Sequence, residues 1–72
     1  MNLVGAVDIG GTKIAVGLVD PAGRILEREV QPTASEKGFE DGLERIRVML
    51  AQCLDRQPGG RLAGVGVGCT GP

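Results

Sequence analysis

The sequence predicts an α/β domain built on a mixed β-sheet, and the order of its apolar patterns carries this prediction. Three apolar runs separated by short turns come first, then apolar residues recur at steps of three and four, and a fourth apolar run follows. Runs joined by tight turns pair as antiparallel strands, whereas a strand reached through a helix returns parallel to an earlier one. We therefore expect an antiparallel three-stranded meander, one helix and a parallel fourth strand beside the first, in the sheet order 3-2-1-4.

The first two strands are expected over Leu3–Ile9 and Thr12–Asp20. The first is almost continuously apolar, which is typical of a central strand buried on both faces. Between them, Gly10 and Gly11 predict a tight hairpin, because glycine takes positive φ without a steric penalty. Asp8 is the polar exception. It either marks the point where the strand reaches solvent or supplies the acid of a metal or phosphate site.

The turn into the third strand is predicted by Asp20-Pro21-Ala22-Gly23, whose residue types suit a type I turn. Asp accepts local N–H bonds at the first position, and Pro presets φ at the second. The third strand, Arg24–Gln31, carries Glu27 and Glu29 on one face, which favours an edge or solvent-facing strand.

A helix is expected from Phe39 to Arg56, after Pro32 has ended the third strand. Thr33 and Glu36 have the spacing of a capping box. Asp41 and Arg45 are spaced for an ion pair on an exposed helix face. The predicted apolar stripe consists of Phe39, Leu43, Ile46, Leu50 and Cys53, widened by Met49 and Leu54.

The fourth strand, Leu62–Cys69, has valines and Cys69 on one face and Gly64, Gly66 and Gly68 on the other. Glycines inside a strand suit a place where a helix, a second backbone or a ligand approaches closely. One sheet face and the outer edge of this strand have no partner among the predicted elements. Residues 1–72 are therefore expected to be an incomplete part of a larger domain.

Composition excludes several classes of protein. The 72 residues carry a net charge of −1 with no basic run, which argues against a nucleic-acid surface. Cys53 and Cys69 lack metal-ligand spacing and are expected to be reduced thiols. Neither a signal peptide nor a stretch long enough for a membrane span is present in the sequence. We expect a soluble, cytoplasmic protein.

Two familiar glycine motifs fit poorly. Gly10-Gly11-Thr12-Lys13 is not a P-loop, because that motif has four residues between its glycines, Lys before Ser or Thr, and a helix afterwards. Residues 66–71 match the spacing G-x-G-x-x-G of a dinucleotide-binding turn. That segment ends at Pro72 and lies at the wrong end of its unit, so we expect no dinucleotide there.

A third pattern is specific. Asp8-Ile9-Gly10-Gly11-Thr12-Lys13-Ile14-Ala15-Val16-Gly17, followed by Asp20, resembles the first phosphate loop of sugar kinases in the actin, hexokinase and Hsp70 superfamily. It is most similar to the ROK family of glucokinases, N-acetylhexosamine kinases and related repressors. The resemblance continues through residues 20–26, Pro32-Thr33 and residues 64–72, and it covers only the opening part of a family member.

The resemblance implies a ribonuclease-H-like, actin-like ATPase lobe and a set of site residues. Gly10, Gly11, Thr12 and Lys13 would line the phosphates of ATP, and Asp8 would serve Mg²⁺. The end of the chain resembles a loop that enters the sugar-side cleft, which implicates Thr70 and Gly71. The physical reason is that backbone N–H groups at a glycine turn form an anion-binding concavity, beside which one carboxylate can hold hydrated Mg²⁺.

No catalytic residue is expected in this chain, because the family's catalytic Asp, its sugar contacts and its zinc loop lie outside it. A structural Zn²⁺ is thus expected only in the remainder. We expect the N-terminal, ATP-binding segment of a kinase acting on a hexose or N-acetylhexosamine, inactive in isolation.

Two alternatives remain. A ROK-type repressor carries a winged helix-turn-helix ahead of this lobe, whereas here only Met1 and Asn2 precede the first strand. A small interaction module would use the uncovered sheet face. The expected partners of the intact protein are ATP and a small sugar, with no nucleic acid and no membrane. Homo-oligomers are expected to form through the remainder or the exposed sheet surface.

Overall fold

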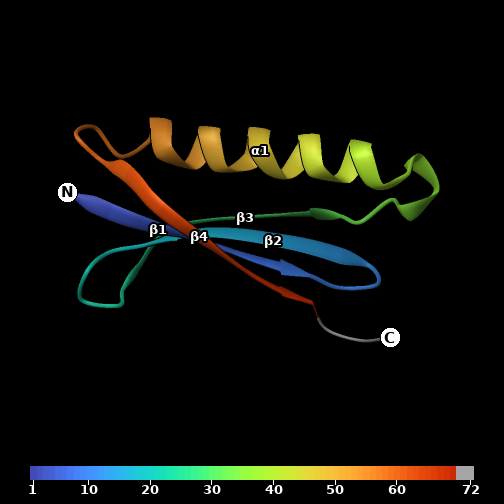
Figure 1. The fold of residues 1–72 in the computed structure, drawn as a ribbon, viewed down its shortest axis with the longest axis horizontal. Coiled ribbons are helices and arrows are strands. Elements are labelled where there is room, and N and C mark those ends of the chain that lie inside the picture. The colour runs from blue at the N-terminus through green and yellow to red at the C-terminus, as the bar shows by residue number, and fades with distance from the viewer. Residues whose placement is uncertain (70–72) are drawn as a thin grey trace.

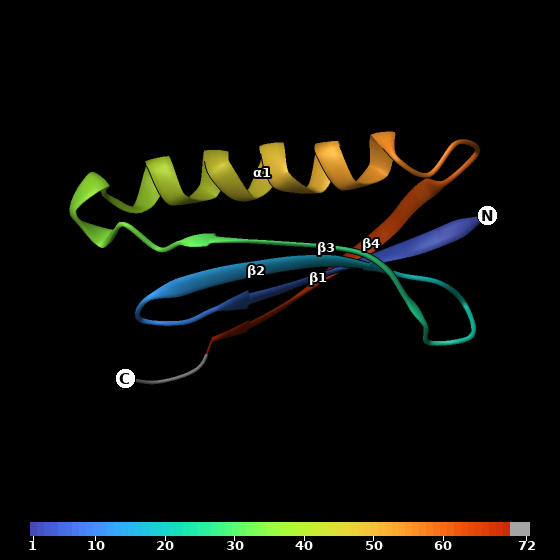
Figure 2. The ribbon, with the colours of Figure 1, turned by 180° about the vertical axis from the view of Figure 1, so that it is seen from behind.

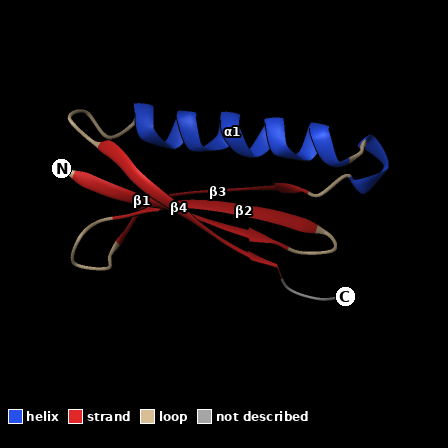
Figure 3. Cartoon of the chain, in the orientation of Figure 1, coloured by secondary structure: helices blue, strands red, loops and turns tan. Residues whose placement is uncertain are grey.

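The computed structural model describes residues 1–69 and shows one sheet with one long helix on a single side of it (Figures 1 and 3). A one-turn 3₁₀ helix, η1, precedes the long helix. The elements are β1 (Asn2–Ile9), β2 (Lys13–Val19), β3 (Ile25–Pro32), η1 (Ser35–Lys37), α1 (Phe39–Asp55) and β4 (Arg61–Cys69). The predicted strands and helix are confirmed, with bounds that differ by at most one residue.

The sheet has the order β3-β2-β1-β4, as predicted. Both hairpin pairs are antiparallel, and β4 runs parallel to β1. This mixed α/β architecture places the β1–β2 bend, the start of α1 and the end of β4 at the same end of the molecule (Figure 1). The residues singled out as a phosphate site therefore lie where three chain segments meet.

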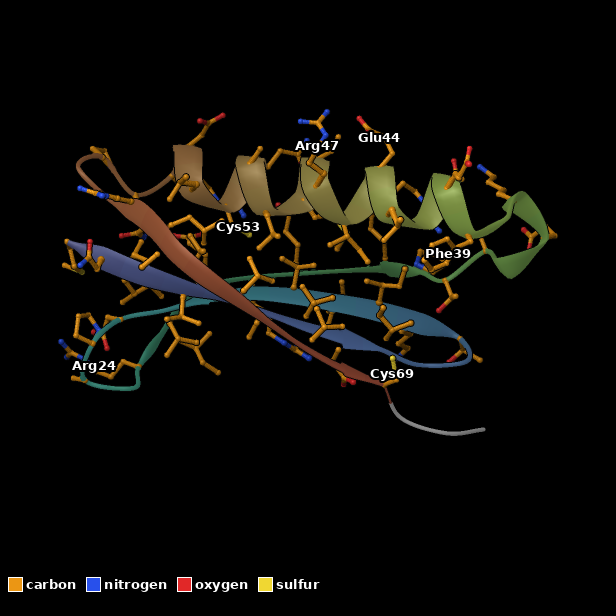
Figure 4. All side chains as sticks on the ribbon, in the orientation of Figure 1. Arg24, Phe39, Glu44, Arg47, Cys53 and Cys69 are labelled. Carbon is orange, nitrogen blue, oxygen red and sulfur yellow. The ribbon has the colours of Figure 1, made fainter. Side chains whose placement is uncertain are left out.

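The core lies between α1 and the sheet face beneath it. Alternation along β1 and β2 sends every second apolar side chain toward the helix, and α1 contributes two fully buried residues. In Figure 4 the side chain of Cys53 points from α1 toward the sheet, whereas Glu44 and Arg47 point away from it. The core side chains are Leu3, Val7, Ile14, Val16, Leu18, Met49 and Cys53.

Five of the seven residues in the predicted apolar stripe of α1 belong to the core or pack against it. Ile46, Leu50 and Leu54 pack against the core, but Phe39 is 78% exposed and Leu43 is 50% exposed. The first turns of the helix line an apolar groove of about 300 Å³, together with Ile9, Ile14 and Cys69 of the sheet. The periodicity therefore identified the correct face but overestimated how far the core extends along it.

β3 is an edge strand, which is one of the two positions that its charges favoured, but its glutamates do not face open solvent. Glu27 pairs with Leu18 across the sheet, so its side chain shares the face covered by α1. Arg56 at the end of α1 donates to Glu27 at 2.8 Å and to Glu29 at 3.1 Å, and Gln57 donates to Glu27 at 2.7 Å. The Arg56 guanidinium lowers the pKa of Glu27. Because they are paired, these carboxylates can lie beside the helix.

The face opposite the helix is open, as expected from the unpartnered strands (Figure 2). Val4 is 47% exposed there, so β1 is buried on one face only. The prediction from its apolar run, burial on both faces, is wrong for the described residues. Small residues of β1, β2 and β4 make this face a shallow concavity of about 540 Å³. An added Cβ on Gly64 or Gly66 would meet no atom within 4 Å. The strand glycines therefore leave room for a further layer.

The predicted turn at Asp20 is confirmed. Gly23 N–H donates to the Asp20 carbonyl at 2.9 Å, and the Asp20 carboxylate accepts from the N–H groups of Ala22 and Arg24. These bonds, led by that from Arg24, lower the pKa of Asp20. Gly23 has φ of +88°, which explains the glycine at this position.

Within the described residues, no helix is both long and apolar enough to span a membrane.

Candidate functional site

The bend between β1 and β2 brings together five predicted site residues, namely Asp8, Gly10, Gly11, Thr12 and Lys13. Asp8 and the three residues from Gly11 to Lys13 are exposed, and Gly10 is half-buried. The bend is closed by a hydrogen bond from Gly10 N–H to the Lys13 carbonyl at 2.8 Å. The predicted hairpin is therefore confirmed, but it is built differently from the expectation.

The reason given for the two glycines is wrong. The positive-φ glycines of the structure are Gly23, Gly38 and Gly59, so neither glycine of the bend needs the left-handed region. An added Cβ on Gly11 would also meet nothing within 4 Å. Neither the backbone conformation nor packing within the described residues requires glycine at position 11. What glycine provides there is open space beside the backbone.

Three of the four carbonyl groups from Gly10 to Lys13 accept hydrogen bonds from residues 1–69, and that of Gly11 does not. Thr33 donates twice, from its hydroxyl to the Gly10 carbonyl at 2.8 Å and from its N–H to the Thr12 carbonyl at 2.9 Å. The Lys13 carbonyl accepts from Gly10, as described above. By contrast, the N–H groups of Gly11 and Thr12 donate to no acceptor among residues 1–69. The bend therefore offers two unengaged N–H donors while three of its four carbonyls are engaged, which suits an anion.

Asp8 and Lys13 lie on the open face of the sheet. Asp8 is paired with Ala15 of β2 and with Gly68 of β4, so its carboxylate leaves the sheet on the side away from α1. Lys13, two residues before Ala15, shares that side by strand alternation. Neither residue enters an ion pair among residues 1–69. One carboxylate and one ammonium are thus available beside the donor-rich bend.

This donor set fits a polyphosphate with Mg²⁺. Two N–H groups and the Lys13 ammonium are suited to phosphoryl oxygens. No group of three or more metal-ligating side chains occurs among the described residues. Asp8 therefore offers the single carboxylate with which Mg²⁺ is commonly held, the other ligands being waters and phosphate oxygens.

Sequence reasoning missed the residues that support the bend. Thr33 was expected to cap the helix, but the residue before α1 is Gly38, and no side chain caps the helix there. Arg45 was expected to form an exposed pair with Asp41. It does so at 3.0 Å, and it also donates to the carbonyls of Pro32, at 2.7 Å, and Thr33. Its side chain is only 21% exposed. The sole sequence signal was the pair Pro32-Thr33 in the family resemblance.

The predicted sugar-side residues, Thr70 and Gly71, lie outside the described residues. The last described residue of β4, Cys69, pairs with Ile9 at the start of the bend. Cys69 is exposed and free, and Cys53 is buried and free. Burial is the main cause that raises the pKa of the Cys53 thiol, and the nearby Glu29 carboxylate raises it further.

Comparison with known proteins gives consistent results. The chain is 38% identical to glucokinases of Thermotoga maritima, over 71 residues, and Streptomyces coelicolor, over 72 residues. Each match covers 99% of this chain and 21% of the relative, so the chain spans about a fifth of the length of these enzymes.

Among solved structures, it superposes with a TM-score of 0.64 on a protein of Cytophaga hutchinsonii provisionally named as a sugar kinase. That match has 31% identity and covers 92% of this chain and 21% of the other. It supports the predicted ribonuclease-H-like, actin-like lobe. The model of the ROK family matches residues 4–72. The chain therefore belongs to the ROK family.

Proposed function

We propose that the β1–β2 bend holds the phosphates of ATP in a sugar kinase that phosphorylates a hexose or an N-acetylhexosamine. The observation that carries this proposal is the hydrogen bonding of the bend. The carbonyls of Gly10, Thr12 and Lys13 accept hydrogen bonds, whereas the N–H groups of Gly11 and Thr12 have no acceptor among residues 1–69. The glucokinases among the relatives favour the kinase over a repressor of the same family. They also favour it over an interaction module that uses the open sheet face.

Each residue has a distinct role in this proposal. Gly11 and Thr12 donate their N–H groups to phosphoryl oxygens, and open space beside Gly11 lets those oxygens approach the backbone. Lys13 adds positive charge on the open face. Asp8 orients a hydrated Mg²⁺ through water. When bound, Mg²⁺ neutralises charge that develops on the phosphates during transfer.

The proposal assigns no catalytic base to residues 1–72. Phosphoryl transfer depends on positioning and charge stabilisation, and the bend supplies only the phosphate side. The isolated chain is therefore proposed to be inactive. If residues 1–72 alone phosphorylated glucose or N-acetylmannosamine above a no-protein blank, this proposal would be contradicted. We assign any structural Zn²⁺ site to the remainder of the protein. Self-association is assigned either to that remainder or to the open sheet face. A cytoplasmic location agrees with the two free thiols.

The test is a Mg-ATP titration and a turnover assay on the full-length protein with Asp8→Asn. The change removes the charge but keeps the size, so the fold should survive. Turnover should fall by at least about 100-fold, the scale seen when one partner of transition-state charge is removed. Asp55→Asn is the matched control, because Asp55 is also exposed, lies at the far end of α1 and enters no ion pair within residues 1–69. Retained turnover in Asp8→Asn would reduce Asp8 to a structural role.

A further inference from the structure

We propose that Thr33 is a positioning residue whose hydroxyl holds the Gly10–Gly11 peptide in the orientation that offers Gly11 N–H to a phosphate. The inference rests on the proposed function of the bend. It starts from the hydrogen bond between the Thr33 hydroxyl and the Gly10 carbonyl, 2.8 Å long and partly buried. This bond joins residues 23 positions apart in the sequence and ties the end of β3 to the bend.

The geometry of a trans peptide explains how a bond to a carbonyl controls an N–H group. The C=O and N–H of one planar trans peptide point in opposite directions. Because Thr33 draws the Gly10 carbonyl toward β3, the Gly11 N–H must point away from β3. The backbone N–H of Thr33 does the same to the next-but-one peptide, because it engages the Thr12 carbonyl and so directs the Lys13 N–H away.

A competing arrangement makes this restraint necessary. In an ordinary hydrogen-bonded β-turn, the carbonyl of the first residue accepts the N–H of the fourth, which here would join Gly10 to Lys13. In the structure the Gly10 carbonyl accepts the Thr33 hydroxyl instead. Two successive glycines rotate easily, since neither carries a Cβ. Without the hydroxyl, the Gly10 carbonyl is free to turn back to the Lys13 N–H and to present an acceptor where a phosphate needs donors.

Thr33 is itself held in place from the helix. Arg45 donates to the carbonyls of Pro32, at 2.7 Å, and of Thr33, and its Nε pairs with Asp41 at 3.0 Å. The chain of contacts therefore runs from the first turns of α1, through the end of β3, to the bend. A rigid support of this kind reduces the entropy lost when the bend binds its ligand.

The experiment compares Thr33→Val, which removes the hydroxyl at nearly constant size, with Thr33→Ser, which keeps it, in the full-length protein. The probe is Mg²⁺ with a non-hydrolysable ATP analogue, and its Kd is measured by calorimetry. Hydrogen exchange of residues 10–13 is measured without nucleotide, as a readout independent of activity. Glu27→Gln is the matched control, because it weakens a contact between β3 and α1 at the opposite end of the strand.

We expect Thr33→Val to raise the Kd by roughly three- to tenfold, the scale of one hydrogen bond, and to change exchange in residues 10–13. Thr33→Ser should bind as the wild type does, and Glu27→Gln should leave the Kd unchanged. If the wild type binds the nucleotide and Thr33→Val binds it with the same Kd, the inference about Thr33 is overturned and the proposed function stands. Absence of nucleotide binding by the wild type would overturn both. If Thr33→Val fails to fold, Thr33→Ala, which removes the hydroxyl without adding bulk, decides by the same Kd.

Discussion

Replacing Gly11 with alanine separates what the fold requires from what a phosphate ligand requires. Gly11 has no positive φ, and an added Cβ would meet nothing within 4 Å. Alanine should therefore fit this backbone and leave stability unchanged or raise it by about 0.4–1 kcal/mol, through the unfolded chain. The methyl group would nevertheless stand beside the donors that we assign to the phosphates. We expect the affinity for Mg-ATP to fall about tenfold or more, which is about 1.4 kcal/mol.

The assay pairs nucleotide calorimetry with urea unfolding of the full-length protein. Gly23→Ala is the control, since its Cβ would also meet open space but its φ is +88°. That variant should lose about 1–2 kcal/mol of stability to the left-handed backbone and keep its nucleotide affinity, because Gly23 lies at the other end of β2. Undiminished binding of Mg-ATP by Gly11→Ala would refute the reasoning. A loss of stability as large as that of Gly23→Ala would show that the fold itself needs this glycine.

Two further predictions follow from the pKa shifts. Hydrogen bonds to its carboxylate lower the pKa of Asp20. The ionised carboxylate therefore stabilises the fold at pH values above the ordinary pKa of about 4. This contribution is lost as the pH falls through the lowered pKa. The urea midpoint of the wild type should therefore approach that of Asp20→Asn as the pH drops from about 5 to about 2, and a constant difference would contradict the assignment. Burial and Glu29 raise the pKa of Cys53, so iodoacetamide should label Cys53 slowly in the native protein and faster in Glu29→Gln. If Cys53 in the native protein were labelled as fast as cysteine in solution, the assigned pKa shift would be contradicted.

Much of the fold could be predicted because its signals are local. The turn at Asp20 depends on residues within four positions, and its bonds form as the residue types indicate. The helix follows from one change of period near Phe39, and short connections leave few ways to order the strands. Five of the seven predicted site residues also lie at one bend, so their proximity needed no tertiary information.

The errors arose where distant segments decide the environment. Glu27 and Glu29 favoured an edge or solvent-facing strand, and β3 does lie at the edge of the sheet. Their partner Arg56, some 30 positions away, could not be predicted from the charged face alone. Phe39 and Leu43 continue the apolar period of α1, but they line an open apolar groove together with Ile9 and Ile14 of the sheet. They therefore stay exposed. A periodic pattern indicates which side of a helix is apolar and contains no information on how closely the sheet packs along that side.

Thr33 shows how one residue can satisfy two local rules that only the fold separates. Its spacing to Glu36 suits a capping box, but α1 begins at Phe39, beyond the reach of that hydroxyl, after η1 has intervened. The ladder between β2 and β3 continues instead to the bond from Thr33 N–H to Thr12, which carries the side chain to Gly10. The two roles differ in consequence. A cap would affect helix stability and leave nucleotide affinity alone, whereas the observed bond should affect the affinity at the bend. The position of the hydroxyl therefore makes Thr33 a support of the proposed phosphate site.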